Sequence, residues 1–276
     1  MSRPLKLGAV MYDPKVSVIW EIIRDFFESL KCPLDVTFYA SYELQVDALM
    51  HREIDIAWNS PLAWLDAQHR SGATCRAIAM RDTDRDRMSY LVARIGGPVN
   101  ALGDLRGRTI AVGAVDSPQA TLIPLGLLRQ SGIEPARNVD VRRFDVVVGM
   151  HGDHVGGELE AFQCLARDEA ACSAMLDLNW QTWTKDGTID PNRFKIIATT
   201  AKFDHCVFTV HKDVDRDAEA RWLNALFSMR YDEPAHREMM DLEGLKAWLP
   251  GRTSGFQALT EAVEAEGLFK SEDFRS

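Results

Sequence analysis

The stretch Ile54-Asp55-Ile56-Ala57-Trp58-Asn59-Ser60-Pro61 joins a short apolar run to the start of a helix. Within it, Ser60 stands where an N-cap is expected and Pro61 where the first helical residue is expected. The stretch Val115-Asp116-Ser117-Pro118 repeats this pattern further along the chain. Each stretch follows an apolar run typical of a buried strand. Both helices are therefore predicted to start at the carboxyl end of a strand.

Strand and helix patterns alternate outward from these two stretches, which predicts an α/β protein with mainly parallel sheets flanked by helices. The expected strands of the first part are 5–11, 34–39, 54–58 and 75–80, with helices at 16–30, 42–50 and 61–70 between them. The pattern resumes with strands at 109–115, 139–144 and 171–178 and helices at 118–131 and 156–166. Strands at 194–199 and 207–210 and three C-terminal helices complete it.

The two alternating parts predict two lobes with a cleft between them. Residues 89–94 read as a strand that crosses from the first lobe, and the chain returns after 199. We assign 1–92 plus 200–276 to a discontinuous lobe one and 93–199 to lobe two. The length of 276 residues suits two lobes of ordinary size.

The composition and charge of the sequence limit the classes of partner that the protein is expected to bind. The net charge is −9 and no basic run occurs, so a nucleic-acid partner is not expected. No stretch reaches the ~20 apolar residues of a membrane helix, so no membrane insertion is expected. The run from Leu5 to Met11 reads as a strand and not as a signal peptide. This predicts a cytoplasmic chain, or a periplasmic or extracellular one if the sequence is a trimmed mature form.

Helix starts at strand ends suit an anionic ligand. Open α/β sheets bind ligands at the carboxyl ends of their strands. A helix N-terminus offers unpaired N–H groups and a positive partial charge there. The plainer interpretation is that Ser-Pro merely starts helices well, but its occurrence at Ser60 and again at Ser117 favours a ligand site. The hydroxyls of Tyr12 and Tyr42 are expected to line the cleft.

Three histidines are candidates for ligand binding or catalysis. His151 and His154 lie in a glycine-rich stretch between a strand and a helix, where they either contact a ligand or are simply solvated. His205 stands at the return to lobe one, next to Cys206. Neighbouring residues on a strand point to opposite faces, so no metal site is predicted here unless His151 or His154 joins it.

One further polar residue and several absent motifs complete the site prediction. Asn179 follows the predicted strand 171–178 and is expected to reach the cleft. The sequence has no GxSxG, no GxxxxGK[ST], no HExxH and no GxGxxG after a strand. No cofactor is therefore predicted.

Together these segments resemble the PhnD-like phosphate, phosphite and phosphonate-binding proteins of ABC transporters, which have the periplasmic-binding-protein type 2 fold. The resemblance rests on three segments and on His154, and spans roughly residues 5–215. The segments are Glu53–Ala63, Leu102–Ala111 and Asp116–Pro124.

The resemblance implies a hinged trap that closes on a small anionic ligand. It implies ligand contacts from Tyr12, Tyr42, Ser60, the Ser117–Thr121 turn and His154. Our full set of expected ligand residues is Tyr12, Tyr42, Asn59, Ser60, Ser117, Gln119, Ala120, Thr121, His154, Asn179 and His205. The sequence departs from the family at Pro118-Gln119-Ala120, where the family favours small Ser, Thr or Gly residues. The ligand is thus expected to be phosphonate-like or a carboxylate, and transporter subunits are expected partners if the chain is exported.

Two other functions stay open from the sequence. The first is a cytoplasmic enzyme on the same fold, a lyase, dehydratase or decarboxylase for a small carboxylated substrate, with His154 or His205 as general acid or base. The second is a ligand sensor that presents its closed form to a partner protein. Binding is favoured over catalysis because no sharp catalytic set is present.

Overall fold

The computed structural model describes residues 3–11, 13–144 and 157–270. Their contacts divide the chain into two compact units. The first holds the described residues up to Arg85 together with Asp204–Gly255, and the second holds those of 86–144, 157–203 and from Phe256 onward. The predicted lobes had their crossings near 92 and 200 and placed the whole C-terminal third in lobe one. In the structure, helix α9 (Gln257–Glu266) packs against α4 (Ile123–Gln130) and so groups with the second unit.

The first unit contains a six-stranded sheet with the order β11-β4-β10-β3-β1-β2. Strand β1 pairs in parallel with β2 and β3, whereas β10 runs antiparallel to β3 and β4. The sheet is therefore mainly parallel, with β10 and β11 running against the other four strands. The strands are β1 Leu5–Val10, β2 Leu34–Tyr39, β3 Ile56–Asn59, β4 Arg76–Arg81, β10 Val207–Val210 and β11 Trp248–Pro250.

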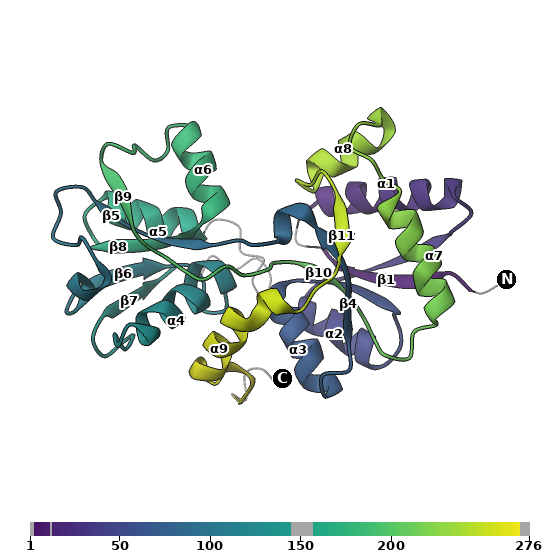
Figure 1. Ribbon diagram of the computed structural model, residues 1–276, viewed down its shortest axis with the longest axis horizontal. Helices are drawn as coiled ribbons and strands as arrows, with labels where there is room; N and C mark the ends of the chain where they lie inside the picture. Colours follow the sequence, from purple (N-terminus) through teal and green to yellow (C-terminus); the bar gives the residue numbers. More distant parts are fainter. Residues whose placement is uncertain (1–2, 12, 145–156, 271–276) are drawn as a thin grey trace. The chain divides into compact units, whose positions relative to one another are not determined.

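Helices cover both faces of this sheet (Figure 1). Helices α1 (Lys15–Ser29), α7 (Arg216–Phe227) and α8 (Pro234–Leu242) lie on one face, and α2 (Tyr42–Met50) and α3 (Pro61–Ser71) lie on the other. The main core lies beneath α1 and α7, where Phe208 of the sheet contacts Trp20 and Trp222 of these helices. Because side chains alternate along a strand, Asn59 points to the opposite face, toward α2 and α3.

The second unit contains a five-stranded sheet with the order β7-β6-β8-β5-β9. Helices α4 and α9 lie on one face, and α5 (Gly157–Ala166) and α6 (Asp177–Lys185) lie on the other (Figure 1). Strands β7 and β8 are parallel to β6, and β5 runs antiparallel to both β8 and β9. The strands are β5 Ser89–Arg94, β6 Thr109–Val112, β7 Asp140–Arg143, β8 Cys172–Leu176 and β9 Phe194–Thr199.

The helix predicted over 118–131 is interrupted. Residues Pro118–Leu122 form a π-helical turn, in which Leu122 N donates to Ser117 O at 2.9 Å, and α4 follows. Pro124 accounts for the wider turn, since its ring would clash with the carbonyl of Ala120 in a regular helix and it has no N–H to donate. Ala120 O instead accepts a hydrogen bond from Gly113 N at 3.3 Å.

The strand predicted over 171–178 is too long. Strand β8 ends at Leu176 and helix α6 begins at Asp177, whose N–H donates to Met88 O at 2.8 Å. Asn179 therefore lies in the first turn of α6, with Asp177 and Leu178 between it and the end of β8.

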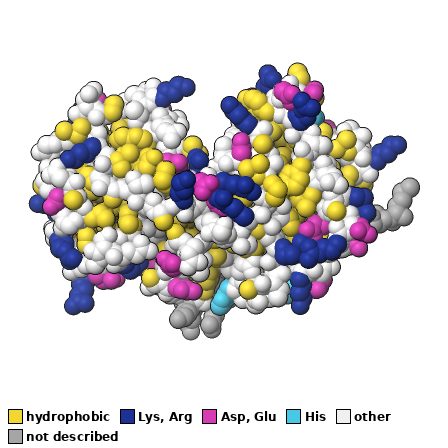
Figure 2. All heavy atoms as spheres, viewed as in Figure 1, with side chains coloured by type: hydrophobic (Ala, Val, Ile, Leu, Met, Phe, Trp, Pro, Cys, Tyr) yellow, Lys and Arg dark blue, Asp and Glu magenta, His cyan; other side chains and the backbone are white. Residues whose placement is uncertain are grey.

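The surface mixes charges of both signs. Figure 2 shows acidic and basic side chains interspersed on the face that it displays. Among the described helices, none combines the length and the apolar character that a bilayer span requires.

Candidate functional site

The first predicted ligand turn begins α3 in the first unit. Ser60 is fully buried and its Oγ accepts from Ala63 N at 3.2 Å, as an N-cap does. Pro61 occupies the first helical position, where its missing N–H removes no helix hydrogen bond. The local structure predicted from Ser-Pro is confirmed here.

Asn59, just before this turn, belongs to a closed network in the first unit. Its Nδ2 donates to Thr209 Oγ1 at 3.0 Å, and its Oδ1 accepts from Gln45 Nε2 at 2.8 Å. Gln45 Nε2 also donates to Trp58 O at 2.9 Å. The network ties α2, β3 and β10 together, and the polar atom left over is an acceptor, Gln45 Oε1, which has no partner among the described residues.

Tyr42 is the first residue of α2 and is only 1% exposed. Its N-cap is Ser41, whose side chain accepts from Leu44 N at 3.4 Å. The structure therefore packs this tyrosine into the first unit as one of its largest fully buried side chains.

The second predicted ligand turn follows β6 in the second unit. Ser117 Oγ accepts from Ala120 N at 3.2 Å, so the Ala120 N–H is engaged within the turn. A Cβ at Gly113 would lie 2.6 Å from the Ala120 Cβ, so the close approach of β6 to the turn requires glycine there. Ser89 holds the turn from β5, because its Oγ donates to Gln119 O at 2.6 Å.

Two polar side chains of this turn are buried, and one atom of each has no partner in the described part of the chain. Thr121 is 1% exposed and Gln119 is 7% exposed. Thr121 Oγ1 and Gln119 Oε1 have no hydrogen-bond partner among the residues that the structure describes. An unsatisfied buried polar atom costs about 1–3 kcal/mol, so these atoms mark a place where a polar guest is favourable.

A second hydroxyl without a partner among the described residues, that of Ser173 on β8, was missed from the sequence. Ser173 is fully buried, and its Oγ has no partner in the described part of the chain. Its neighbours Cys172 and Ala174 pack into the core on the α4 side, so Ser173 points to the other face of the sheet. A polar residue inside the apolar run Cys172–Leu176 was the signal available.

Asn179 is held by a carboxylate in the second unit. Its Nδ2 donates to Glu158 Oε2 at 2.8 Å, and the same oxygen accepts from Leu176 N at 2.8 Å. Glu158 thereby joins the start of α5 to the junction of β8 and α6. This contact gives Asn179 a local structural role.

His205 lies beside two other reactive groups of the first unit. Its Nδ1 is 3.1 Å from Cys206 Sγ and 3.6 Å from Asp84 Oδ1. Burial would raise the pKa of Asp84, but the charge and hydrogen bonds of Arg81, with those of His205, lower this pKa to about 2. The prediction that His205 and Cys206 point to opposite faces is wrong, because both precede β10 and are not in a strand.

Three predicted residues, Tyr12, His151 and His154, lie outside the described residues. The remaining predicted ligand residues fall into two sets, one in each unit. Asn59, Ser60, Tyr42 and His205 belong to the first unit, and Ser117, Gln119, Ala120, Thr121 and Asn179 belong to the second.

Two sheets flanked by helices on a discontinuous chain define a protein of the periplasmic-binding-protein class. Three solved structures share this fold. XAC2383 from Xanthomonas citri bound to ATP has a TM-score of 0.72 and 17% identity over the whole of both chains. PhnD1 from Prochlorococcus marinus in complex with methylphosphonate has a TM-score of 0.67 and 14% identity, covering 95% of this chain and 98% of that one. The aliphatic sulphonate binding protein SsuA from Escherichia coli has 0.61 and 12%, covering 98% and 94%.

A family model identifies the chain further. The model described as "ABC transporter, phosphonate, periplasmic substrate-binding protein" matches residues 12–256, so the chain belongs to this family. An uncharacterized protein of Haemophilus influenzae is 62% identical over 29 residues, which are 10% of this chain. This chain spans 41% of the length of that curated relative.

These comparisons confirm some of the predictions made from the sequence and do not support others. The two-lobed α/β class and the resemblance to PhnD-like proteins are confirmed. The family match supports the binding function and gives no support to the lyase alternative. The family is described as periplasmic, so the predicted cytoplasmic location is not supported, whereas the alternative of an exported, trimmed form agrees with that description.

Proposed function

We propose that this chain binds a small tetrahedral oxyanion, a phosphonate or a chemically similar sulfonate, through the Ser117–Thr121 turn. The observation that carries the proposal is the buried hydroxyl of Thr121, which has no hydrogen-bond partner among the described residues. Gln119, whose Oε1 also lacks a partner there, belongs to the same turn. The Thr121 hydroxyl is able to donate, and donors are what an anion requires.

The backbone around these side chains adds to their attraction for an anion. The π-helical turn Pro118–Leu122 leads directly into α4, and the N-terminal end of this helical segment carries a positive partial charge. Pro118 and Pro124 fix the turn, and Gly113 allows β6 to approach it closely. A binding group held by this much local structure loses little conformational entropy when the ligand arrives.

The first unit supplies a second contact in this proposal, the N-terminus of α3 at Ser60. Its side-chain hydroxyl caps the helix, so its contribution comes from the end of the helix and not from a free hydroxyl. Asn59 supports this turn from below through Thr209 and Gln45. In this proposal each turn supplies an anion-binding group of its own unit.

The departure from the family pattern at Pro118-Gln119-Ala120 bears on which ligand fits. Proline and alanine bring no side-chain donor, so Thr121 and Gln119 take the place of a run of small hydroxyl residues. Fewer hydroxyl donors suit an anion with an organic substituent better than inorganic phosphate, which presents oxygens on all sides. We infer that an organophosphonate or organosulfonate is the preferred ligand class.

The family to which the chain belongs supports a role in delivering the ligand to an ABC transporter. Periplasmic substrate-binding proteins of this kind pass their ligand to membrane subunits, and we propose the same role and an exported location for this chain. The proposal assigns no catalytic step to His154 or His205.

A ligand panel tests the proposal. Thermal unfolding and calorimetry are run with methylphosphonate, phosphite, phosphate, an alkanesulfonate, a dicarboxylate and ATP. We expect methylphosphonate or the alkanesulfonate to raise the unfolding temperature, since a ligand at about 100 times its Kd adds about 2.7 kcal/mol. Stabilisation by ATP alone would move the assignment to nucleotides, and no stabilisation by any of these anions would contradict it.

The enzyme alternative is tested in the same samples. Each mixture is followed by NMR for many hours after the ligand has bound. The proposal expects the bound compound to be recovered unchanged. Product formation by the wild-type chain that disappears in His205→Gln would establish catalysis and overturn the binding-only assignment.

A further inference from the structure

Asp84, His205 and Cys206 form a cluster of three metal-ligating side chains in the first unit. One ligand atom from each lies within 4.8 Å of the other two. Asp84 is 2% exposed and Cys206 is 4% exposed. A carboxylate, an imidazole and a thiol are the three ligand types that zinc takes in proteins.

Backbone hydrogen bonds bring these residues together from distant parts of the sequence. His205 N donates to Asp84 O at 2.8 Å, and Cys206 N donates to Asp84 Oδ1 at 3.2 Å. Asp84 lies in the short 3₁₀ turn that follows β4, and His205 and Cys206 lie just before β10. The cluster is thus set by the fold of the unit and not by flexible surface side chains.

We propose that this cluster binds one zinc ion, with Cys206 Sγ, a ring nitrogen of His205 and an Asp84 carboxylate oxygen as ligands. Zinc bonds of about 2.0–2.3 Å in a tetrahedron place neighbouring ligand atoms roughly 3.4–3.6 Å apart. The observed Nδ1–Sγ distance is 3.1 Å and the Nδ1–Oδ1 distance is 3.6 Å. Small side-chain rotations are sufficient to admit the ion, and a water or an added ligand completes the fourth position.

Arg81 and Glu243 provide the surrounding charge. Arg81 donates to Asp84 Oδ2 at 2.6 Å and to Oδ1 at 2.8 Å, and also to Glu243 Oε2 at 2.7 Å. One guanidinium, two carboxylates, one thiolate and one divalent ion sum to zero charge. A neutral buried group avoids the desolvation cost of an uncompensated charge, and Arg81 orients the carboxylate as an outer-shell partner.

The Nε2 atom of His205 does not restrict the orientation of the imidazole ring. His205 Nε2 is buried and has no hydrogen-bond partner among the described residues. No second hydrogen bond therefore fixes the ring, and either nitrogen is able to turn toward the ion. A buried ring nitrogen without a partner calls for an explanation, and coordination of an ion by this nitrogen would supply one.

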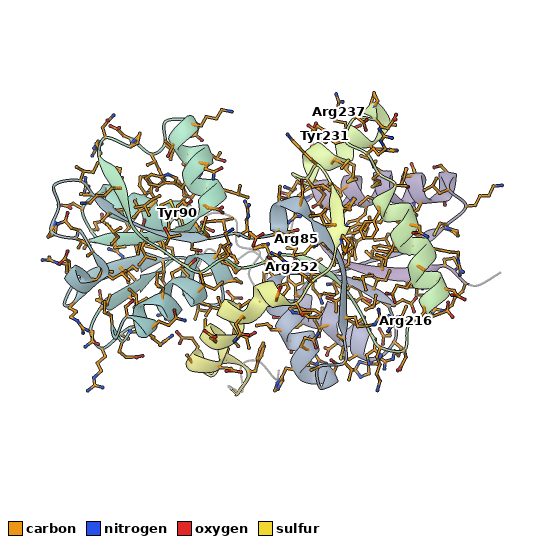
Figure 3. The ribbon with its side chains drawn as sticks, in the orientation of Figure 1. Arg85, Tyr90, Arg216, Tyr231, Arg237 and Arg252 are labelled. Carbon is orange, nitrogen blue, oxygen red and sulfur yellow. The ribbon has the colours of Figure 1, made fainter. Side chains whose placement is uncertain are left out.

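The location gives the ion a structural role. Asp84 immediately precedes Arg85, where the chain leaves the first unit, and His205 immediately follows Asp204, where it returns. Figure 3 labels Arg85 and Arg252 in this part of the unit, and Arg252 pairs with Asp204 through two hydrogen bonds of 2.6 Å. Zinc would clip the outgoing and returning segments together and stabilise the unit.

Cobalt titration of the full, untagged, metal-free chain tests the site. Co²⁺ reports a thiolate ligand by a charge-transfer band, and Zn²⁺ then displaces it. We expect one equivalent of Co²⁺ to give this band and one equivalent of Zn²⁺ to abolish it. We also expect Zn²⁺ to raise the unfolding temperature. Absence of the band in the wild-type chain would overturn the proposal.

Matched variants locate the ion. Cys206→Ser and His205→Gln are expected to lose the band and the Zn²⁺ stabilisation, and Asp84→Asn to weaken Zn²⁺ binding at least tenfold. Cys75→Ser and His211→Gln, which alter a buried cysteine and a buried histidine of the same unit outside the cluster, are expected to keep both. Circular dichroism verifies that each variant is folded. A band that survives in folded Cys206→Ser, or disappears equally in Cys75→Ser, would also contradict the assignment.

Discussion

The turns at Ser60 and Ser117 begin with the same Ser-Pro pair and the same N-cap hydrogen bond, yet their surroundings differ. Around Ser60, Asn59 has both ends of its side-chain amide engaged, and the atom left without a partner is an acceptor on Gln45. Around Ser117, the atoms without a partner among the described residues are Gln119 Oε1, which is also an acceptor, and the Thr121 hydroxyl. Around the first turn the unpartnered atom in the described part of the chain is an acceptor, whereas the second turn also has the hydroxyl of Thr121, which is able to donate to a guest.

This difference separates a structural role from a binding role at two sites that look alike in sequence. An anion needs donors, and an unpaired acceptor repels it. The first turn therefore contributes the fixed end of a helix, and the second contributes side-chain recognition. The predictions below test this division, starting with the largest expected effect.

Replacing Asn59 is expected to affect stability more than binding. Asn59→Ala leaves Gln45 Nε2 and Thr209 Oγ1 each without one of their partners in the core, which is expected to cost about 1–3 kcal/mol in the free energy of unfolding. Urea denaturation measures this loss. Asn179→Ala is the matched control in the second unit, and is expected to cost less because Glu158 keeps its bond from Leu176 N. Equal losses in the free energy of unfolding for the two variants would show that the Asn59 network does not stabilise the chain more than the Asn179 contact does.

Removing the two capping hydroxyls is expected to give similar losses. Ser60→Ala and Ser117→Ala each delete an N-cap hydrogen bond of 3.2 Å, and each is expected to cost about 1 kcal/mol of stability. Threonine at either position is expected to restore most of that loss. Thermal and urea unfolding of the four variants provide the check. If Ser117→Ala cost nothing while Ser60→Ala did, the equivalence of the two caps would be disproved.

The smallest expected effect is on the pH dependence of stability. It arises from His211, which is far from both turns in the sequence. Burial, with the nearby charge of Arg52, lowers the pKa of His211 in the folded chain. The neutral ring therefore contributes stability that is present above the unfolded-state pKa of about 6.5 and is lost as the pH falls through the lowered folded-state pKa. His211→Gln is expected to flatten this part of the stability profile between pH 5 and 7.5 without altering ligand affinity. An unchanged profile would contradict the assignment.

The sequence predicted the serine N-cap and the helix start at both turns, because Ser-Pro after a buried strand has few alternatives. The periodicity of apolar residues predicted the ends of most strands and helices to within a few residues. The sequence did not predict the π-helical turn, which depends on how Pro124 and Gly113 meet in space. It also missed Ser173 and the contact of Asp84 with His205, because both depend on pairing between segments far apart in the chain.

Ligand affinity of Thr121→Val, beside Ser173→Ala, tests the central claim most directly. Both variants remove a buried hydroxyl that has no partner among the described residues of the second unit, but only Thr121 lies on the turn. The account predicts that Thr121→Val weakens binding of the anion found in the panel by about 10- to 100-fold, the value of a hydrogen bond to a charged group, without loss of stability in the free protein. Ser173→Ala is predicted to bind normally. Unchanged affinity in folded Thr121→Val would contradict the account.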